Sequence, residues 1–305
     1  MASPTGTTDA PFGRMLTAMV TPFTADGEVD YVAVRRLAAY LVDEQRNDGL
    51  IVNGTTGESP TTSDEEKQRI VSAVLDAVGD RATVVAGAGT NDTRHSVELA
   101  KQAARAGAHG LLVVTPYYNK PPQEGLYRHF TAVADATDLP VMLYDIPGRS
   151  GVPIKTETLI RLAQHERIVA VKDAKGDLFA GSQVMAATDL AFYSGDDLLN
   201  LAWLSLGAAG FVSVVGHVVG AELARMIRLH KSGDIAQALA IHGQVAPVVD
   251  GIMLRAGGAI MAKAALSMVG VPVGPVRLPL VDATEQENAE LRACLVAGGV
   301  KLTDV

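Results

Sequence analysis

The chain has 305 residues, of which 48% are hydrophobic, 20% charged and only 5% aromatic. This length allows one large domain or two ordinary ones, with a core that needs no disulfide or structural metal. A formal charge of -8 and a pI near 5.4 provide no general positive field for phosphate backbones, which argues against a nucleic-acid partner. The single cysteine, Cys294, excludes an intrachain disulfide framework and a cysteine-based zinc cluster.

Two segments bear on targeting and membranes. Residues 1–13 are rich in Ser, Thr, Gly and Pro and lack the basic and apolar regions of a signal peptide, so we expect a disordered lead and a cytoplasmic protein. Residues 198–221 contain no Asp, Glu, Lys or Arg and approach the length of a membrane span. Gly207 and Gly210 divide this stretch into a helix-like and a strand-like part. We therefore expect a buried helix–turn–strand unit and no membrane association.

Eight short runs of apolar and β-branched residues recur along the chain, each followed by a helical pattern. They are residues 16–20, 50–53, 83–86, 110–114, 141–144, 168–172, 190–193 and 210–214. This number and alternation predict an α/β fold of the TIM (β/α)8 barrel type over residues 14–232.

The chain after the eighth strand is too long for one closing helix. Helical patterns cover residues 233–249, 255–269 and 283–297, with breaks at Gly251, at Gly257-Gly258 and over residues 272–279. We expect residues 233–305 to form a C-terminal helical appendage packed on the barrel rather than a second catalytic domain.

In barrels of this type, the chemistry lies where the strands end and the following loops begin. The strand over residues 168–172 ends with Lys172, followed by Asp173. Burial would disfavour the ammonium and leave a free amine that can attack a carbonyl. Alternatively, the lysine extends out of the barrel to meet Asp173 or Asp196. The strand itself leaves both interpretations open.

The neighbouring strand carries two further candidates. Tyr144 ends this strand, where its phenol could move a proton near Lys172 or simply serve as an amphipathic core residue. Arg149 lies in a loop bounded by Pro147, Gly148 and Gly151. Its guanidinium could clamp a carboxylate or remain solvated.

The loops after the second and fourth strands are also suggestive. Gly54-Thr55-Thr56-Gly57 offers hydroxyls and close backbone approach to a small oxyanion, although an ordinary βα turn has the same composition. Tyr117 and Tyr118 stand between prolines in a loop where both cannot be core residues.

Three competing classes of site are weakly supported. Gly87-Ala88-Gly89 lacks the third glycine of a dinucleotide fingerprint, and the chain contains neither an H-E-x-x-H pair nor a G-x-S-x-G elbow. The sequence therefore gives little support to an NAD site, a metal site of the H-E-x-x-H type or a serine hydrolase.

Taken together, the strand-end motifs carry a resemblance. The motifs are Gly54-Thr55-Thr56-Gly57-Glu58, Pro116-Tyr117-Tyr118-Asn119, Tyr144-x-x-Pro-Gly-Arg149, Val171-Lys172 and Ser194-Gly195-Asp196-Asp197. From about Gly13 to the C-terminal helices, the chain resembles the dihydrodipicolinate synthase family of the pyruvate-dependent class I aldolase superfamily. The resemblance implies a lyase that condenses pyruvate with L-aspartate 4-semialdehyde to 4-hydroxy-tetrahydrodipicolinate in diaminopimelate and lysine biosynthesis. It also implies no metal or organic cofactor and a homotetramer of two tight dimers.

The resemblance assigns catalytic roles to four residues. Lys172 matches the lysine that forms a Schiff base with pyruvate, and Tyr144 matches the tyrosine that relays protons. Thr55 matches the threonine that links two tyrosines in this relay. Tyr118 matches the tyrosine that reaches across a dimer interface into the neighbouring active site.

Four further residues are matched to substrate binding. Thr56 corresponds to the residue whose backbone amide holds the pyruvate carboxylate, and Arg149 to the arginine that receives the carboxylate of aspartate semialdehyde. Gly195 and Val212 correspond to positions that line the pyruvate pocket.

A candidate effector pocket departs from the pattern of regulated family members. Ser59, Asn91 and Tyr117 fit residues that line the lysine feedback site. Lys67 and His95 stand where those members commonly have a histidine and a glutamate. A lysine effector needs an acidic partner, and Lys67 adds like charge, so we expect weak or absent inhibition by lysine.

Two substitutions near the predicted site are expected to change little. Asp145 stands where many members have asparagine and Ser150 where many have threonine, and both remain polar.

Two alternative functions remain at this stage. Another pyruvate-dependent aldolase, such as N-acetylneuraminate lyase or a 2-keto-3-deoxy sugar acid aldolase, would share the Lys/Tyr pair, but Thr55-Thr56 with Arg149 favours the synthase. A non-catalytic barrel that binds a keto acid should have lost part of the Lys/Tyr/Thr/Tyr set, and none is missing.

Overall fold

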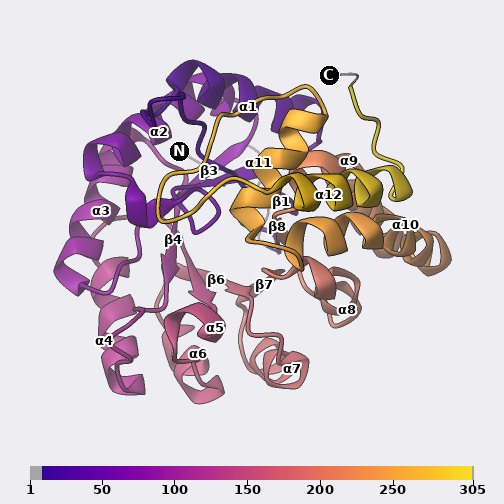
Figure 1. Cartoon of the computed structure of the whole chain (residues 1–305). Helices are drawn as coiled ribbons and strands as arrows, with labels where there is room; N and C mark the ends of the chain where they lie inside the picture. The colour runs from indigo at the N-terminus through magenta and orange to yellow at the C-terminus, as the bar shows by residue number, and fades with distance from the viewer. Residues whose placement is uncertain (1–8, 304–305) are drawn as a thin grey trace.

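The computed structural model describes residues 9–303 and contains a closed parallel barrel. Each strand pairs with the next in sequence, and β8 closes the barrel against β1 (Figure 1). The strands are β1 Met15–Ala18, β2 Gly49–Val52, β3 Thr83–Gly87, β4 Gly110–Val114, β5 Val141–Asp145, β6 Ile168–Asp173, β7 Ala191–Ser194 and β8 Gly210–Ser213. The predicted TIM barrel is confirmed, with strand ends that differ from the expected ones by one or two residues.

Helices surround the barrel and continue beyond it. The barrel helices are α1 Tyr31–Asp43, α2 Asp64–Val78, α3 Thr93–Ala106, α4 Gln123–Ala134, α5 Pro147–Ser150, α6 Thr156–Leu162, α7 Leu178–Ala187, α8 Asn200–Ser205 and α9 Gly216–Lys231, with short 3-10 turns η1 Ser59–Thr61 and η2 Asp197–Leu199. Three C-terminal helices follow: α10 Ile235–Met253, α11 Gly258–Met268 and α12 Glu285–Ala297. In Figure 1 they lie together on one side of the barrel, next to α9.

The start of α2 shows how local sequence sets a helix end. Ser63 Oγ accepts from the Glu66 amide at 3.2 Å, and Glu66 Oε2 accepts from the Ser63 amide at 2.8 Å, a capping box that satisfies two free amides. Ile70, Val74 and Val78 then form a fully buried face, as their spacing predicts.

The segment before β1 corrects one expectation. Residues 1–8 of the predicted disordered lead lie outside the described residues, but Ala10 and Phe12 are buried. Phe12 packs against the start of β4, where a Cβ added to Gly110 would lie 2.4 Å from the Phe12 ring. Its carbonyl also accepts from Thr83 Oγ1 at 2.5 Å. The expectation of disorder is therefore wrong for residues 10–12, because one aromatic ring closes the end of the barrel where the strands begin.

The uncharged stretch over residues 198–221 forms α8, β8 and the first turns of α9, as predicted. Among residues 9–303, no single helix is long and apolar enough to cross a membrane. Within this described part of the chain, one helix pair, α10 and α11, meets the criterion when taken together, and its two helices are bent by 117°.

The C-terminal region also differs in detail from the expected pattern. Gly251 does not end a helix but lies inside α10, where an added Cβ would come within 2.8 Å of the Cys294 Cβ on α12. The glycine therefore serves close helix packing. The division between a barrel over residues 14–232 and an appendage over residues 233–305 stays a prediction.

The connection between α11 and α12 returns to the barrel opening (Figure 1). The Phe23 amide, in the loop after β1, donates to the Val273 carbonyl at 2.9 Å. Arg277 donates to both carboxylate oxygens of Glu66 near the start of α2. The C-terminal region thus contacts the two loops that follow β1 and β2.

Candidate active site

Lys172 and Tyr144 lie side by side within the barrel. They are paired in the register of β5 and β6, and both are almost fully buried. The Lys172 Nζ atom lies 4.1 Å from the centre of the Tyr144 ring. No ion pair to Lys172 is present within residues 9–303, and only 4% of the residue is exposed. The alternative in which this lysine reaches out to Asp173 or Asp196 is therefore wrong.

Burial controls the protonation of both groups. Desolvation is the main cause that lowers the pKa of Lys172 to about 7. The Asp197 charge opposes this lowering, and the nearby Arg149 charge contributes to it. Desolvation also raises the pKa of Tyr144 to about 12, against the lowering effect of a hydrogen bond with Thr55. At neutral pH, a substantial fraction of Lys172 is thus the free amine beside a protonated phenol.

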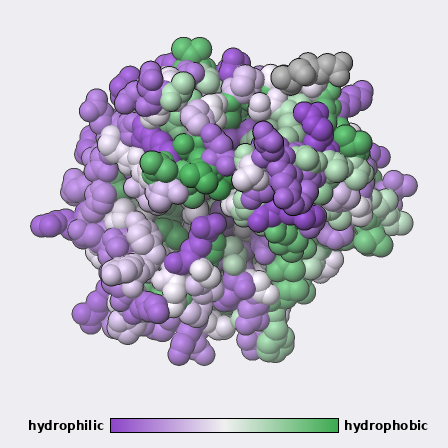
Figure 2. Space-filling model, viewed as in Figure 1, coloured by the Kyte–Doolittle hydropathy of each residue, from purple (hydrophilic) through white to green (hydrophobic). Residues whose placement is uncertain are grey.

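A cavity of about 320 Å³ opens beside this pair at the carboxyl ends of the strands. Thr55, Tyr118, Tyr144 and Arg149 line it, from the β2, β4 and β5 ends. Figure 2 shows this face hollowed near its centre, with both hydrophobic and hydrophilic side chains around the hollow. The structure therefore brings four of the eight predicted catalytic and substrate-binding residues around one open cavity.

The remaining predicted residues lie deeper or beside it. Thr56 is 8% exposed, and Val212 is buried on β8 in the same inner apolar cluster as Tyr144. Gly195 follows β7, and a Cβ added there would lie 2.8 Å from Lys172 Cγ. A glycine at this position thus leaves room for the lysine side chain.

Tyr118 differs from the other candidates because it is 89% exposed. Its φ of 73° lies in the left-handed region, which is uncommon for a residue with a Cβ. A strained backbone that presents an aromatic ring to solvent is a costly arrangement, and such strain often accompanies function.

The candidate effector residues divide between the cavity and its surroundings. Ser59 and Tyr117 line the same cavity as Arg149. The buried Lys67 ammonium donates to the Ser59 carbonyl at 2.9 Å and to the Thr62 carbonyl. His95 Nε2 lies 2.9 Å from Asp64 Oδ2.

The fifth of these residues, Asn91, contacts the loop that carries Tyr118. Its carbonyl accepts from Asn119 Nδ2 at 2.9 Å.

Asp197 is a further functional candidate. It belongs to the motif Ser194-Gly195-Asp196-Asp197, but the motif alone assigns it no role. Its carboxylate accepts from Ser213 Oγ at 2.6 Å and from the amides of Val214 and Val215 at 2.7 and 3.0 Å. It is buried, and its charge raises the pKa of Lys172. The available signal was an acidic residue in the loop after a barrel strand, and its distant partners at and just after the end of β8 were not visible in the sequence.

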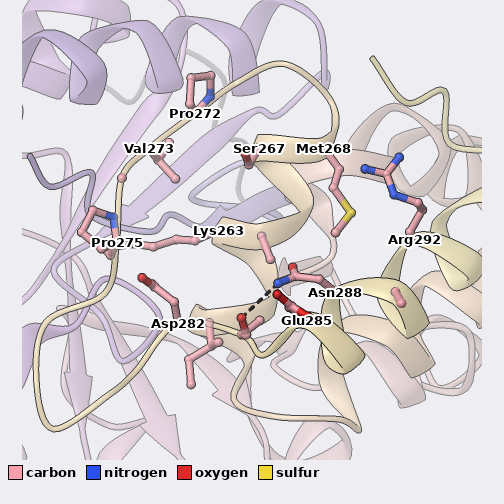
Figure 3. Close-up of a pocket in the computed structure, with 15 residues that line it drawn as sticks. Lys263, Ser267, Met268, Pro272, Val273, Pro275, Asp282, Glu285, Asn288 and Arg292 are labelled. Atoms are coloured by element: carbon pink, nitrogen blue, oxygen red, sulfur yellow. Dashed lines mark hydrogen bonds between the residues drawn. The ribbon is translucent and has the colours of Figure 1, made fainter. Parts of the chain in front are cut away.

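A second, larger cavity lies away from these residues. It measures about 790 Å³ between α11, α12 and their connection, with Lys263, Asp282 and Arg292 on its walls (Figure 3). Among residues 9–303, no three His, Cys, Asp or Glu side chains are grouped as metal ligands.

Comparisons with known proteins agree in pointing to one family. The model of the dihydrodipicolinate synthetase family matches residues 11–297. The chain is 64% identical over 300 residues to 4-hydroxy-tetrahydrodipicolinate synthase 2 of Streptomyces coelicolor, covering 98% of this chain and 100% of the relative. It is also 64% identical to 4-hydroxy-tetrahydrodipicolinate synthase of Acidothermus cellulolyticus, over 95% of this chain and 94% of the relative. The crystal structure of DHDPS from Cyanidioschyzon merolae with lysine bound superposes with a TM-score of 0.92 at 46% identity, covering 95% of this chain and 99% of that one.

Proposed function

Because the chain belongs to the dihydrodipicolinate synthetase family, we propose that it condenses pyruvate with L-aspartate 4-semialdehyde to 4-hydroxy-tetrahydrodipicolinate. This is a class I aldolase-type lyase reaction of diaminopimelate and lysine biosynthesis. The observation that carries the proposal is the buried Lys172 amine against the Tyr144 ring, beside a cavity that Arg149 lines.

The first half of the reaction uses pyruvate. The neutral Lys172 amine attacks the pyruvate ketone to give a carbinolamine, and loss of water leaves a protonated imine. The imine withdraws electrons from the methyl group, which loses a proton to form an enamine. The Thr56 amide binds the pyruvate carboxylate, while Gly195 and Val212 shape the pocket around it.

Protons must enter and leave this buried centre. Tyr144 lies against the Lys172 amine and is hydrogen-bonded to Thr55, so it is placed to pass protons to and from the carbinolamine. Tyr118 completes the relay from a neighbouring subunit. Its high exposure in the single chain supports this assignment.

The second half joins the two substrates. The enamine carbon attacks the aldehyde of L-aspartate 4-semialdehyde, whose carboxylate is held by Arg149 at the cavity wall. The substrate amine then attacks the imine carbon, which closes the ring and releases Lys172 as the free amine. The alternative aldolases are not favoured, since the relatives compared carry the synthase name.

We also propose that the protein is a cytoplasmic homotetramer built from two tight dimers. Exposed apolar side chains support self-association: Tyr118 near the site and Phe179 on α7, which is 74% exposed. Figure 2 shows hydrophobic surface over the region of α7.

The test is the consumption of L-aspartate 4-semialdehyde by the purified protein in the presence of pyruvate, coupled to the next reductase with NADPH. We expect rapid turnover and a pyruvate adduct that borohydride traps on the protein. Lys172→Ala should abolish both, whereas Arg149→Ala should keep the adduct and impair use of the aldehyde. An adduct retained in the Lys172→Ala protein would refute the assignment of the Schiff base.

A further inference from the structure

A buried ion pair lies behind the active-site strands, on the side opposite Lys172. Successive strand residues point to opposite faces, so Asp145 and Asp173 lie on the helix side of β5 and β6 while Tyr144 and Lys172 face inward. The Lys175 Nζ atom lies 3.2 Å from Asp145 Oδ2, with side-chain exposures of 14% and 0%.

Both members of the pair hold the backbone of the same residue, Ile154. The Ile154 amide donates to Asp145 Oδ1 at 3.1 Å, and Lys175 Nζ donates to the Ile154 carbonyl at 3.4 Å. Asp173 shapes the turn that presents Lys175, because its Oδ1 accepts from the amides of Lys175 and Gly176 at 3.0 and 2.9 Å.

Ile154 is the far end of the segment that carries Arg149. This Arg149 segment, residues 146–154, leaves β5 directly after Asp145, forms the single turn α5 and passes through Gly151 at a φ of 80°. Ser150 Oγ donates within the segment, to the carbonyls of Ile146 and Val152. One end is covalently joined to Asp145 and the other is tied to it through Ile154, so the ion pair closes the segment into a fixed loop.

We propose that Asp145 and Lys175 are positioning residues that hold the Arg149 segment and thereby set the affinity for the second substrate. The kinetic part rests on the proposed function, in which Arg149 receives the carboxylate of that substrate. From the sequence we expected the aspartate at position 145 to change little. In the structure its carboxylate pairs with Lys175, three positions after the proposed Schiff-base residue Lys172. A buried carboxylate left without its cation is strongly unfavourable, so the two residues act as a unit.

The experiment compares Lys175→Met, Asp145→Asn and the double variant with the parent protein. In Lys175→Met we expect the KM for L-aspartate 4-semialdehyde to rise by on the order of tenfold, since small displacements of a positioning group cost rate and affinity. The KM for pyruvate and the borohydride-trapped adduct should not change. The double variant should lie closer to the parent than Lys175→Met does, because it buries no uncompensated charge.

Hydrogen exchange at the Ile154 amide gives a readout that does not depend on substrate. We expect faster exchange in both single variants, because Asp145→Asn weakens the acceptor of this amide and Lys175→Met removes the donor to the Ile154 carbonyl, so each loosens the backbone at residue 154. Lys155→Met is the matched control: it removes an exposed lysine one residue further on, and no ion pair to it is present within residues 9–303. This control should match the parent in both measurements.

Each contrary result has a distinct meaning. Unchanged exchange at Ile154 in Lys175→Met overturns the positioning role, and faster exchange with an unchanged aldehyde KM overturns the link to substrate binding. Additive effects in the double variant would show that the residues do not act as a pair. The proposed function fails if the parent protein does not turn over or if Arg149→Ala binds the aldehyde normally. In that case, exchange at the Ile154 amide alone tests whether Asp145 and Lys175 hold the Arg149 segment.

Discussion

The chemistry at the residue scale depends on keeping one amine neutral in a closed space. Lys172 is buried, and no counter-ion from the described residues 9–303 contacts it, so its pKa falls to about 7. Arg149 contributes to this lowering, which means that the residue proposed to bind the second substrate also prepares the nucleophile for the first. Asp197, in the η2 turn after β7, opposes the shift, and its carboxylate is held by the Val214 amide just after β8.

The rate of pyruvate adduct formation should therefore follow the titration of Lys172. Only the neutral amine attacks the ketone, so the rate should rise with pH, with a midpoint near the pKa of about 7, and level off above it. Removing the positive charge in Arg149→Ala raises the pKa, so its midpoint should move to higher pH. The measurement is borohydride trapping at short times across a pH series. Arg128→Ala, which removes an exposed arginine on α4, should keep the parent midpoint.

At the scale of elements, α2 carries Lys67, whose side chain is held by the η1 turn and the residue after it. This lysine is one of the residues of the candidate effector pocket. The Lys67 ammonium is buried and donates to the Ser59 and Thr62 carbonyls, and burial lowers its pKa. Ser59 also lines the active-site cavity, so the Lys67 ammonium is bound to a residue of the cavity wall.

Free L-lysine is accordingly expected to inhibit weakly or not at all. Its ammonium would meet the Lys67 charge rather than a free carboxylate, because Asp64 already contacts His95. The check is turnover with increasing L-lysine, together with calorimetric titration of the protein. Strong inhibition at sub-millimolar lysine would contradict this expectation. The relative from Cyanidioschyzon merolae, crystallised with lysine bound, supplies a suitable positive control.

At the scale of the whole molecule, the C-terminal helices are joined to the active-site loop by a buried ion pair. Lys263 Nζ on α11 lies 2.7 Å from Glu58 Oε1, with side-chain exposures of 4% and 2%. Lys263 also donates to the Pro275 carbonyl at 2.7 Å, as its direction in Figure 3 suggests, and Glu58 Oε2 accepts from the Arg277 amide at 2.8 Å. Glu58 follows Thr55-Thr56-Gly57, so these helices help to hold the proposed pyruvate-binding turn.

Breaking the Lys263–Glu58 pair should lower the free energy of unfolding by more than the removal of an exposed lysine does. Lys263→Met leaves the Glu58 carboxylate buried without a cation, and we expect a loss of about 3 to 5 kcal/mol in the free energy of unfolding. Denaturant unfolding of Lys263→Met is compared with Lys301→Met, an exposed lysine of the same region. A loss equal to that of the control would show that the pair does not anchor the C-terminal helices.

The proposed assembly gives a prediction at the same scale. Light scattering should report a mass about four times that of the 31.9 kDa chain. Tyr118→Phe should keep this mass and lose turnover, because it removes a relay hydroxyl and retains the ring. A monomer with full activity would contradict the role given to Tyr118.

The sequence by itself determined the barrel, the helix–turn–strand order of residues 198–221 and the strand-end residues that carry the family resemblance. These features are local: a strand is a short run of apolar residues, and its functional side chain follows directly, as Lys172 and Tyr144 do. Phe12 was missed because a lone aromatic ring in a Gly- and Pro-rich segment has no periodicity.

The tertiary structure alone decided which charges meet. Asp197 accepts from an amide just after β8, and Asp145 pairs with Lys175 from the loop after the neighbouring strand β6. Glu58 accepts from the Arg277 amide, 219 positions away in the sequence. Such pairs form only when the barrel closes and the C-terminal helices return to its opening. Whether a buried charge is tolerated depends on a counter-charge supplied from another part of the chain, and no local pattern records that partner.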